Sequence, residues 1–146
     1  MAPWPTGTAA AVARASERAK ALGARRAVPL QVSAPFHCAL MKPAEDRLAP
    51  ELRAVKTRDP RVPVVANVDA QPKRTAAESI DALIKQVSSP VRWESVVQRL
   101  ASDGVTHYVE VGPGKALSGM IKRIAGGATI HNVEGPADLA AVEALS

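Results

Sequence analysis

The sequence predicts an α/β protein with parallel strand pairs. Three apolar segments of strand length, at residues 62–68, 106–111 and 129–133, alternate with segments of helical periodicity. Strands that alternate with helices are typical of α/β layering. The apolar fraction of 47%, with 23% charged residues, is that of a folded protein, and 146 residues suffice for one domain or for part of a larger one.

The chain is expected to begin with an irregular segment, a helix and a strand. Residues 1–8 contain Pro and Gly and predict irregular structure. Thr8 is a candidate N-cap for a helix over residues 9–22 that stops at Gly23. Residues 26–32 predict a strand, and Pro29 inside it indicates a sheet edge or a bulge.

A loop and a second helix follow that strand. Pro43 suits the first turn of a helix, where Glu45 and Asp46 complement the helix dipole. Pro50 predicts that this helix bends or ends early. Residues 62–68 then predict a short buried strand, closed by a turn at residues 69–72.

The remaining elements alternate between helix and strand. Thr75 and Glu78 form a capping box for a helix whose apolar stripe runs to Val87 and which ends before Pro90. Trp93 is expected to be a packing residue. Further elements are helices over residues 91–100, 116–124 and 136–145 and strands over residues 106–111 and 129–133.

The turn Gly112-Pro113-Gly114-Lys115 allows two interpretations. It links a strand to a helix, where free backbone amides can bind an anion such as phosphate. The spacing of a P-loop is absent. A tight structural turn is the interpretation that we favour.

Charge and composition limit the classes of partner. The net charge of +5 is spread along the chain, and aromatic residues make up only 3%, so stacking platforms for single-stranded nucleic acid are almost absent. We expect no nucleic-acid partner. A basic face suits an acidic protein or the phosphates of coenzyme A equally well.

Cellular location and metal content are also constrained. No apolar run approaches the roughly 18 residues of a membrane helix, and the start of the sequence has no secretory signal core. One cysteine, Cys38, excludes an internal disulfide and a multi-cysteine zinc site. We expect a cytoplasmic protein that has no membrane partner and no metal site.

The loop before Pro43 contains the candidate catalytic residue, His37. Histidine can act as a base near neutral pH, although a loop histidine that only bonds its neighbours is the alternative. Pro35-Phe36-His37-Cys38-Ala39-Leu40-Met41-Lys42-Pro43 resembles the histidine motif of malonyl-CoA:acyl carrier protein transacylases. Further segments resemble the same family in the same order and extend the resemblance from about residue 9 to the C-terminus: residues 62–68, 82–87, 89–93, 110–120 and 132–134.

The resemblance implies a specific fold. The family has an α/β-hydrolase-like large subdomain with a small ferredoxin-like subdomain inserted. Residues 9–32 resemble the last helix and strand of the ferredoxin-like small subdomain, after the irregular residues 1–8. Residues 33–146 resemble the second half of the large subdomain, with its parallel strands.

The resemblance also implies site residues and substrates. His37 would act as general base and then general acid. The backbone carbonyl of Gln86 would hold the other ring nitrogen and fix the tautomer. Phe36 and Asn67 would contact substrate, and in related acyltransferase domains a Phe-His pair accompanies the choice of malonyl. Malonyl would pass from coenzyme A to the phosphopantetheine thiol of acyl carrier protein, with no metal or organic cofactor.

The sequence departs from the family in lacking a nucleophile. None of the serines has glycine two residues away on both sides, as a G-x-S-x-G elbow requires; they are residues 16, 33, 79, 88, 89, 95, 102, 118 and 146. Cys38 is adjacent to His37 and would point to the opposite side of an extended chain, so we interpret it as a buried small residue.

The elbow serine, the oxyanion glutamine and the malonyl-binding arginine of the family belong to an N-terminal half, a missing partner of this sequence. We therefore expect the isolated chain to be inactive. The alternative is a non-catalytic module that retains a surface for the carrier protein.

Overall fold

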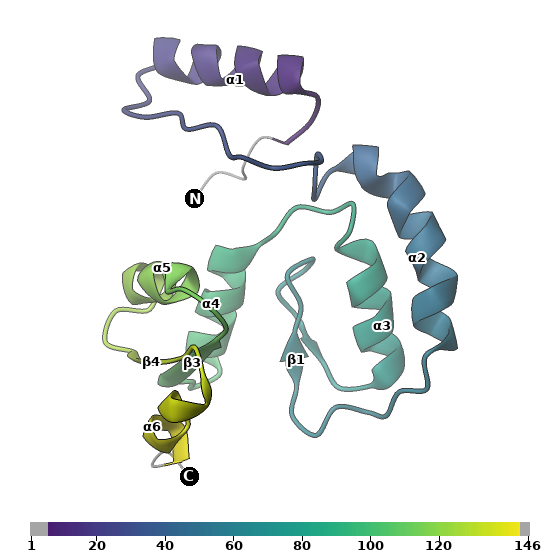
Figure 1. The fold of residues 1–146 in the computed structure, drawn as a ribbon, viewed down its shortest axis with the longest axis vertical. Helices are drawn as coiled ribbons and strands as arrows, with labels where there is room; N and C mark the ends of the chain where they lie inside the picture. The colour runs from purple at the N-terminus through teal and green to yellow at the C-terminus, as the bar shows by residue number, and fades with distance from the viewer. Residues whose placement is uncertain (1–5, 144–146) are drawn as a thin grey trace. The chain divides into compact units, whose positions relative to one another are not determined.

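The computed structural model describes residues 6–143, which divide after Arg92 into two compact units. Figure 1 shows the order of the elements along the chain. The first unit contains α1, η1, α2, β1, β2 and α3, and the second contains α4, β3, α5, β4, η2 and α6.

Helix α1 spans Ala9–Ala21, as its local sequence predicts. Thr8 is the N-cap, and its hydroxyl accepts a hydrogen bond from the amide of Ala11 at 3.3 Å. The chain turns at Gly23, whose φ of 89° favours glycine.

The prediction of a strand over residues 26–32 is wrong. These residues are irregular, and Val28, Leu30 and Val32 are 53, 59 and 63% exposed. A strand forms when its backbone groups pair with a neighbouring strand, and no described strand lies alongside this segment. β-propensity without a pairing partner therefore does not produce a strand here.

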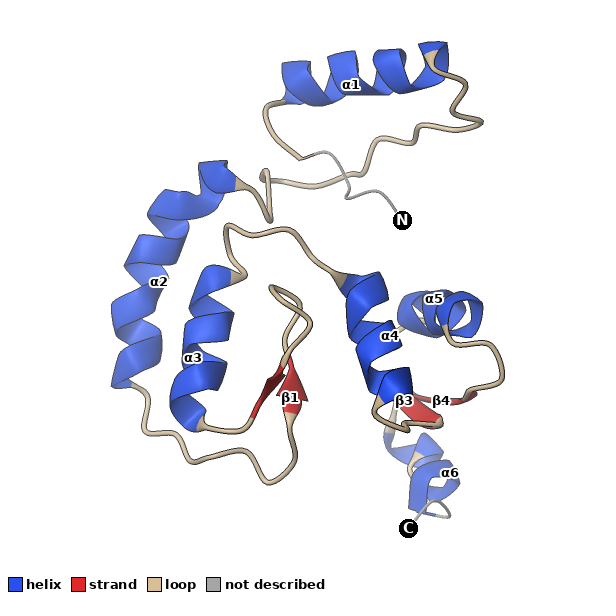
Figure 2. Ribbon diagram, turned by 180° about the vertical axis from the view of Figure 1, so that it is seen from behind, coloured by secondary structure: helices blue, strands red, loops and turns tan. Residues whose placement is uncertain are grey.

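Helix α2 spans Lys42–Ala54 and follows the short 3₁₀-helix η1, Ala39–Met41. Pro43 lies in its first turn, as predicted. Of the two outcomes predicted for Pro50, a bend or an early end, the early end does not occur, because the helix continues through Pro50 to Ala54. Figures 1 and 2 show α2 beside α3, and this packing supports the helix past a residue that lacks an N–H donor.

Strands β1 (Val64–Val65) and β2 (Pro72–Lys73) form a short antiparallel pair. The strand predicted over residues 62–68 is therefore reduced to two residues, and its pairing is antiparallel. It is also not buried, because Val64 is 45% exposed. Six residues separate the strands, which is too short for a parallel crossover. In the turn, the carboxylate of Asp69 accepts from the amide of Gln71 at 3.0 Å.

Helix α3 spans Ala76–Lys85 and begins with the predicted capping box. The hydroxyl of Thr75 accepts from the amide of Glu78 at 3.2 Å, and the carboxylate of Glu78 accepts from the amide of Thr75 at 3.1 Å. The helix ends at its C-cap, Gln86.

The second unit is built on a parallel strand–helix–strand arrangement. Helix α4 (Trp93–Ser102) precedes β3 (His107–Val111), and α5 (Ala116–Ile124) connects β3 to β4 (Thr129–Val133). The strands pair in parallel, as predicted, and the register places His107 opposite Thr129 and Val111 opposite Val133. Helix α5 packs against both strands and against α4 (Figure 2).

The core of this unit centres on Val97, Tyr108 and Ile121, and Trp93 packs against it as predicted. The end of the unit differs from the single helix predicted over residues 136–145. It consists of η2 (Pro136–Asp138) and α6 (Ala140–Glu143), and residues 144 and 145 of the predicted helix lie outside the described residues.

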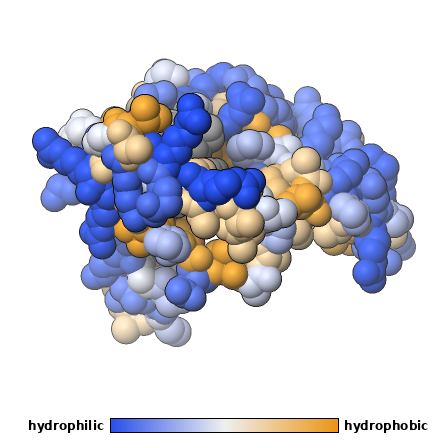
Figure 3. Space-filling model, turned by 90° about the horizontal axis from the view of Figure 1, so that it is seen from above, coloured by the Kyte–Doolittle hydropathy of each residue, from blue (hydrophilic) through white to orange (hydrophobic). Residues whose placement is uncertain are grey.

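Many apolar side chains remain at the surface of the described residues. Figure 3 shows hydrophobic residues among hydrophilic ones on the face that it presents. Val111 on β3 is 78% exposed and Leu22 after α1 is 79% exposed. Among residues 6–143 there is no helix of the length and apolarity needed to cross a membrane.

Candidate active site

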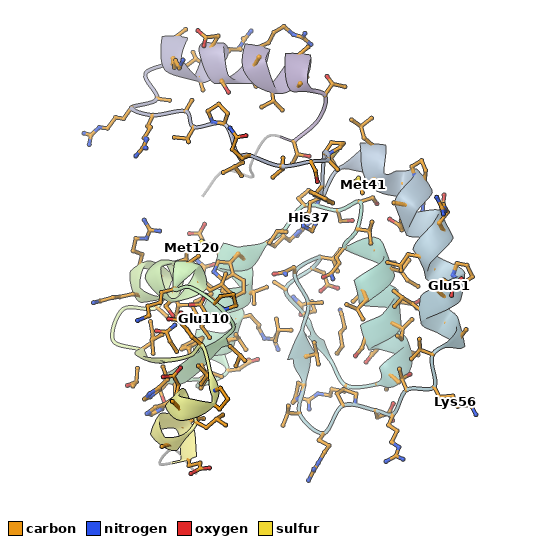
Figure 4. The ribbon with its side chains drawn as sticks, viewed as in Figure 1. His37, Met41, Glu51, Lys56, Glu110 and Met120 are labelled. Carbon is orange, nitrogen blue, oxygen red and sulfur yellow. The ribbon has the colours of Figure 1, made fainter. Side chains whose placement is uncertain are left out.

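His37 lies in a loop that its own neighbours hold in place (Figure 4). Its φ is 60°, in the left-handed region that residues other than glycine seldom adopt. On one side, the carbonyl of Phe36 accepts from the hydroxyl of Thr6 at 2.9 Å. On the other, the thiol of Cys38 donates to the carbonyl of Pro35 at 3.1 Å. A residue in this region persists only where its surroundings over-determine the backbone, and such positions cluster at functional sites.

The imidazole of His37 contacts the end of helix α3. Its Nδ1 lies 2.9 Å from the carbonyl oxygen of Gln86. The last four carbonyls of a helix have no partner within the helix, so the C-cap residue offers a free acceptor. A carbonyl only accepts, so Nδ1 donates the hydrogen and Nε2 of the neutral ring is left as the proton acceptor.

The structure brings His37 and the carbonyl of Gln86 together. Among the hydrogen bonds of the described residues, none joins the imidazole to Phe36 or to Asn67. Phe36 is adjacent to His37 in the chain, and the residue is 46% exposed. The backbone carbonyl of Asn67 accepts from the amide of Arg92 at 3.0 Å, which ties the residues after β1 to the end of the first unit.

Cys38 is half-buried, and its thiol donates to Pro35 rather than to His37. This geometry gives the sulfur a local structural partner. It provides no proton path between the thiol and the imidazole.

Two residues beside this site, Glu45 in α2 and Ser88 in the turn after α3, were not assigned to the site from the sequence. Glu45, in the first turn of α2, is only 7% exposed. Its Oε1 lies 2.6 Å from Nζ of Lys42, and its Oε2 accepts a short hydrogen bond from the hydroxyl of Ser88. The bond from Lys42, followed by that from Ser88, lowers the pKa of Glu45. The sequence indicated only an acid in a first turn, because Ser88 is 43 residues away.

A carboxylate of the chain itself, that of Glu110 on β3, lies beside the glycine turn of the second unit. The carboxylate of Glu110 accepts from the amides of Leu117 at 3.0 Å and Ser118 at 2.7 Å, at the start of α5 (Figure 4 labels Glu110). It also accepts from the hydroxyl of Ser118 at 2.5 Å and from the side chain of Asn132 at 3.3 Å. These bonds, that of the Ser118 hydroxyl first, lower the pKa of Glu110.

Two of the amides that could bind a phosphate at this turn, those of Leu117 and Ser118, are therefore occupied by Glu110, which supports the interpretation as a structural turn. Ser118 is engaged by Glu110 and Asn132 and is not presented as a free nucleophile. Within residues 6–143, no three His, Cys, Asp or Glu side chains are grouped to hold a metal ion.

Two of three comparisons with known proteins find relatives of this chain. No protein-family model matches the chain. The malonyl CoA-acyl carrier protein transacylase of Salmonella typhimurium is 50% identical over 131 residues, which are 90% of this chain and 42% of the relative. The chain thus spans less than half of the length of the curated relatives that it matches.

Solved structures agree with the sequence relatives. An acyl-carrier-protein S-malonyltransferase from Burkholderia pseudomallei superposes with a TM-score of 0.87 and 46% identity, over 93% of this chain and 44% of that one. A malonyl-transacylase solved in complex with a type II PKS acyl-carrier protein gives a TM-score of 0.88 and 41% identity, over 96% of this chain and 45% of that one.

Proposed function

Because the chain belongs to the malonyl CoA-acyl carrier protein transacylase family, we propose that it supplies the general base for malonyl transfer from coenzyme A to acyl carrier protein. The observation that carries the proposal is the 2.9 Å contact between Nδ1 of His37 and the carbonyl of Gln86. It orients the imidazole as the third member of a catalytic triad does, through a neutral acceptor. The substrates would be malonyl-CoA and phosphopantetheinylated carrier protein, with no metal or organic cofactor.

The proton movements follow from the free Nε2. A serine of the family's N-terminal half would attack the malonyl thioester while Nε2 takes its hydroxyl proton, and Nε2 would then give this proton to the departing coenzyme A sulfur. In the second half of the reaction, Nε2 takes the proton of the phosphopantetheine thiol and returns it to the serine as malonyl is transferred. The negative end of α3 faces the imidazolium that forms between these steps.

Phe36 and Asn67 are proposed to line the substrate site. Phe36 precedes the base and has an exposed ring, so it can meet an acyl group that approaches Nε2. Acyl carrier protein as a partner is supported by the related malonyl-transacylase that was solved with a carrier protein. We propose that this chain corresponds to the C-terminal part of a family member and that the nucleophilic serine belongs to the N-terminal part.

The runner-up function is a non-catalytic module that binds the carrier protein. The observation in its favour is the sequence itself, which contains no G-x-S-x-G elbow, and the engagement of Ser118 by Glu110. The two functions differ in whether His37 matters for transfer.

The test is a chimera in which this chain replaces the matched residues of the Salmonella typhimurium relative. We expect it to transfer malonyl from malonyl-CoA to acyl carrier protein, and His37→Ala to slow transfer by roughly 10²–10⁴-fold. Binding of malonyl-CoA should change much less, because the histidine acts on the proton in transfer. A folded chimera that keeps near-normal turnover after His37→Ala would contradict the proposed role. Carrier-protein binding by this chain, with no transfer by the chimera, would favour the module.

A further inference from the structure

A second link joins the two segments that form the His37 site. His37 precedes η1 and α2, and Gln86 ends α3. Glu45 lies in the first turn of α2, and Ser88 lies two residues after Gln86. The contacts His37–Gln86 and Glu45–Ser88 therefore connect the same two stretches of backbone at neighbouring points.

Glu45 is unusual because it is a buried carboxylate. A carboxylate that is 7% exposed has lost most of its hydration, and such groups are retained only when hydrogen bonds replace the water. Its salt bridge to Lys42 is local, within one turn of α2, and Lys42 is itself 57% exposed. That pair could form equally well at the surface. The bond to Ser88 is the contact that requires burial, because it reaches another segment.

The turn that Ser88 belongs to needs an anchor. After Lys85 the backbone leaves α3, and the amide of Val87 reaches the carbonyl of Ile84 only at 3.3 Å. A single hydrogen bond from Nδ1 would let the imidazole and the Gln86 carbonyl pivot about each other. Two bonds, through His37 and through Glu45, define the relative position of the segments.

We propose that Glu45 is a positioning residue, which acts through Ser88 to hold the carbonyl of Gln86 against Nδ1 of His37. It thereby selects the ring tautomer in which Nε2 is free to accept a proton. The inference rests on the proposed function for its catalytic meaning, but the positioning itself is a property of the chain and is testable without activity.

The test uses the whole chain with ¹⁵N-labelled histidine, at about pH 8, which is above the ordinary pKa of a histidine side chain. Long-range ¹H–¹⁵N spectra distinguish the tautomers, and His37→Asn assigns the signal of His37 among the three histidines. We expect a single Nδ1–H tautomer in the unmodified chain. Glu45→Ala and Ser88→Ala should each give averaged ring nitrogens, and the double variant should add nothing further.

Two further variants complete the design. Asp46→Ala is the matched control, because Asp46 also pairs with Lys42, at 3.0 Å on the same helix, but has no bond to Ser88. It should leave the His37 signal unchanged. Glu45→Gln keeps an oxygen that can accept from Ser88 and should retain the tautomer. Circular dichroism of every variant shows whether it remains folded, and Ser88→Ala keeps the test decisive if Glu45→Ala unfolds.

The proposal is overturned if the unmodified chain shows both tautomers, or if folded Glu45→Ala and Ser88→Ala chains keep the wild-type signal. In the chimera, the same two substitutions should lower kcat by on the order of tenfold to a hundredfold with little change in KM. An inactive unmodified chimera would count against the proposed function alone, since the spectra of the chain would still report on Glu45.

Discussion

His37 is oriented by a main-chain group, and this has a consequence for mutagenesis. The carbonyl of Gln86 is present whatever the side chain at that position, so the identity of residue 86 matters only through the backbone that it adopts. In the chimera, Gln86→Ala should leave turnover within about twofold of the parent, because the contact to Nδ1 of His37 uses the backbone carbonyl, which this substitution keeps. Steady-state rates for Gln86→Ala and His37→Ala, measured side by side, check this. A loss as large as that of His37→Ala would show that the glutamine amide takes part directly.

Phe36 offers a test of acyl selectivity at the same site. If its ring fills the space that a branching methyl group would need, Phe36→Ser should raise the ratio of kcat/KM for methylmalonyl-CoA over malonyl-CoA. One methyl group is worth about 1–3 kcal/mol of discrimination, so the change should be finite rather than absolute. Competition between the two thioesters in the chimera measures the ratio directly. An unchanged ratio would remove Phe36 from the specificity determinants.

The sequence predicted the site only in part. His37 and Gln86 could be proposed because the resemblance to a family names both positions, and the contact between them is present. Glu45 and Ser88 could not, since their bond spans 43 residues and local patterning carries no information about it. The left-handed backbone of His37 was equally hidden, because no glycine or asparagine marks it.

The start of helix α5 is the element whose stability should depend most directly on a titrating group. Glu110 occupies the amides of Leu117 and Ser118, and its pKa in the folded chain lies below the ordinary value of about 4.3. A carboxylate with a lowered pKa stabilises the fold fully above its unfolded pKa, and this contribution is lost as the pH falls through the folded pKa.

Glu110→Gln should therefore lower the thermal midpoint at pH 7, and the difference from the unmodified chain should shrink as the pH falls below roughly 4. Thermal melts of both chains across this range check the prediction. Comparing the two chains isolates Glu110 from the other carboxylates with lowered pKa values, such as Glu45 and Glu78. A difference that stays constant with pH would mean that the charge of Glu110 contributes nothing.

Elements with local signals were predicted well, and elements that depend on tertiary partners were not. Three helices are indicated by residues within or next to them: α1 by its N-cap Thr8, α3 by the Thr75–Glu78 capping box, and α5 by its apolar periodicity. The absence of a strand at residues 26–32 and the continuation of α2 through Pro50 depend on what lies beside them. The antiparallel pairing of β1 with β2 follows from the short connection between them. The apolar pattern of residues 62–68 carries no information about this pairing.

The described residues leave apolar surface exposed, and the relatives contain further residues that could cover such surface in them. A parallel sheet normally has both faces covered, yet Val109 and Val111 of β3 are 39 and 78% exposed. The relatives are more than twice as long as the matched part of this chain. We therefore expect the chain by itself to aggregate at lower concentrations than the chimera does, so its spectra and thermal melts require dilute, monomeric samples.

If His37 and the nucleophilic serine lie on different parts of a family member, labelling by malonyl-CoA should require both parts. The chain alone should not become malonylated, because Ser118 is held by Glu110 and Asn132 and the thiol of Cys38 faces the carbonyl of Pro35. When the chain is mixed with the unmatched part of the Salmonella typhimurium relative, malonyl-CoA should label that part on its serine, and His37→Ala in this chain should slow the labelling. Intact-mass measurement of each polypeptide separates the two cases. A malonyl increment on this chain alone, abolished by Cys38→Ala or by Ser118→Ala, would mean that the chain carries its own nucleophile, and the assignment of His37 as a base for a serine elsewhere would then have to be abandoned.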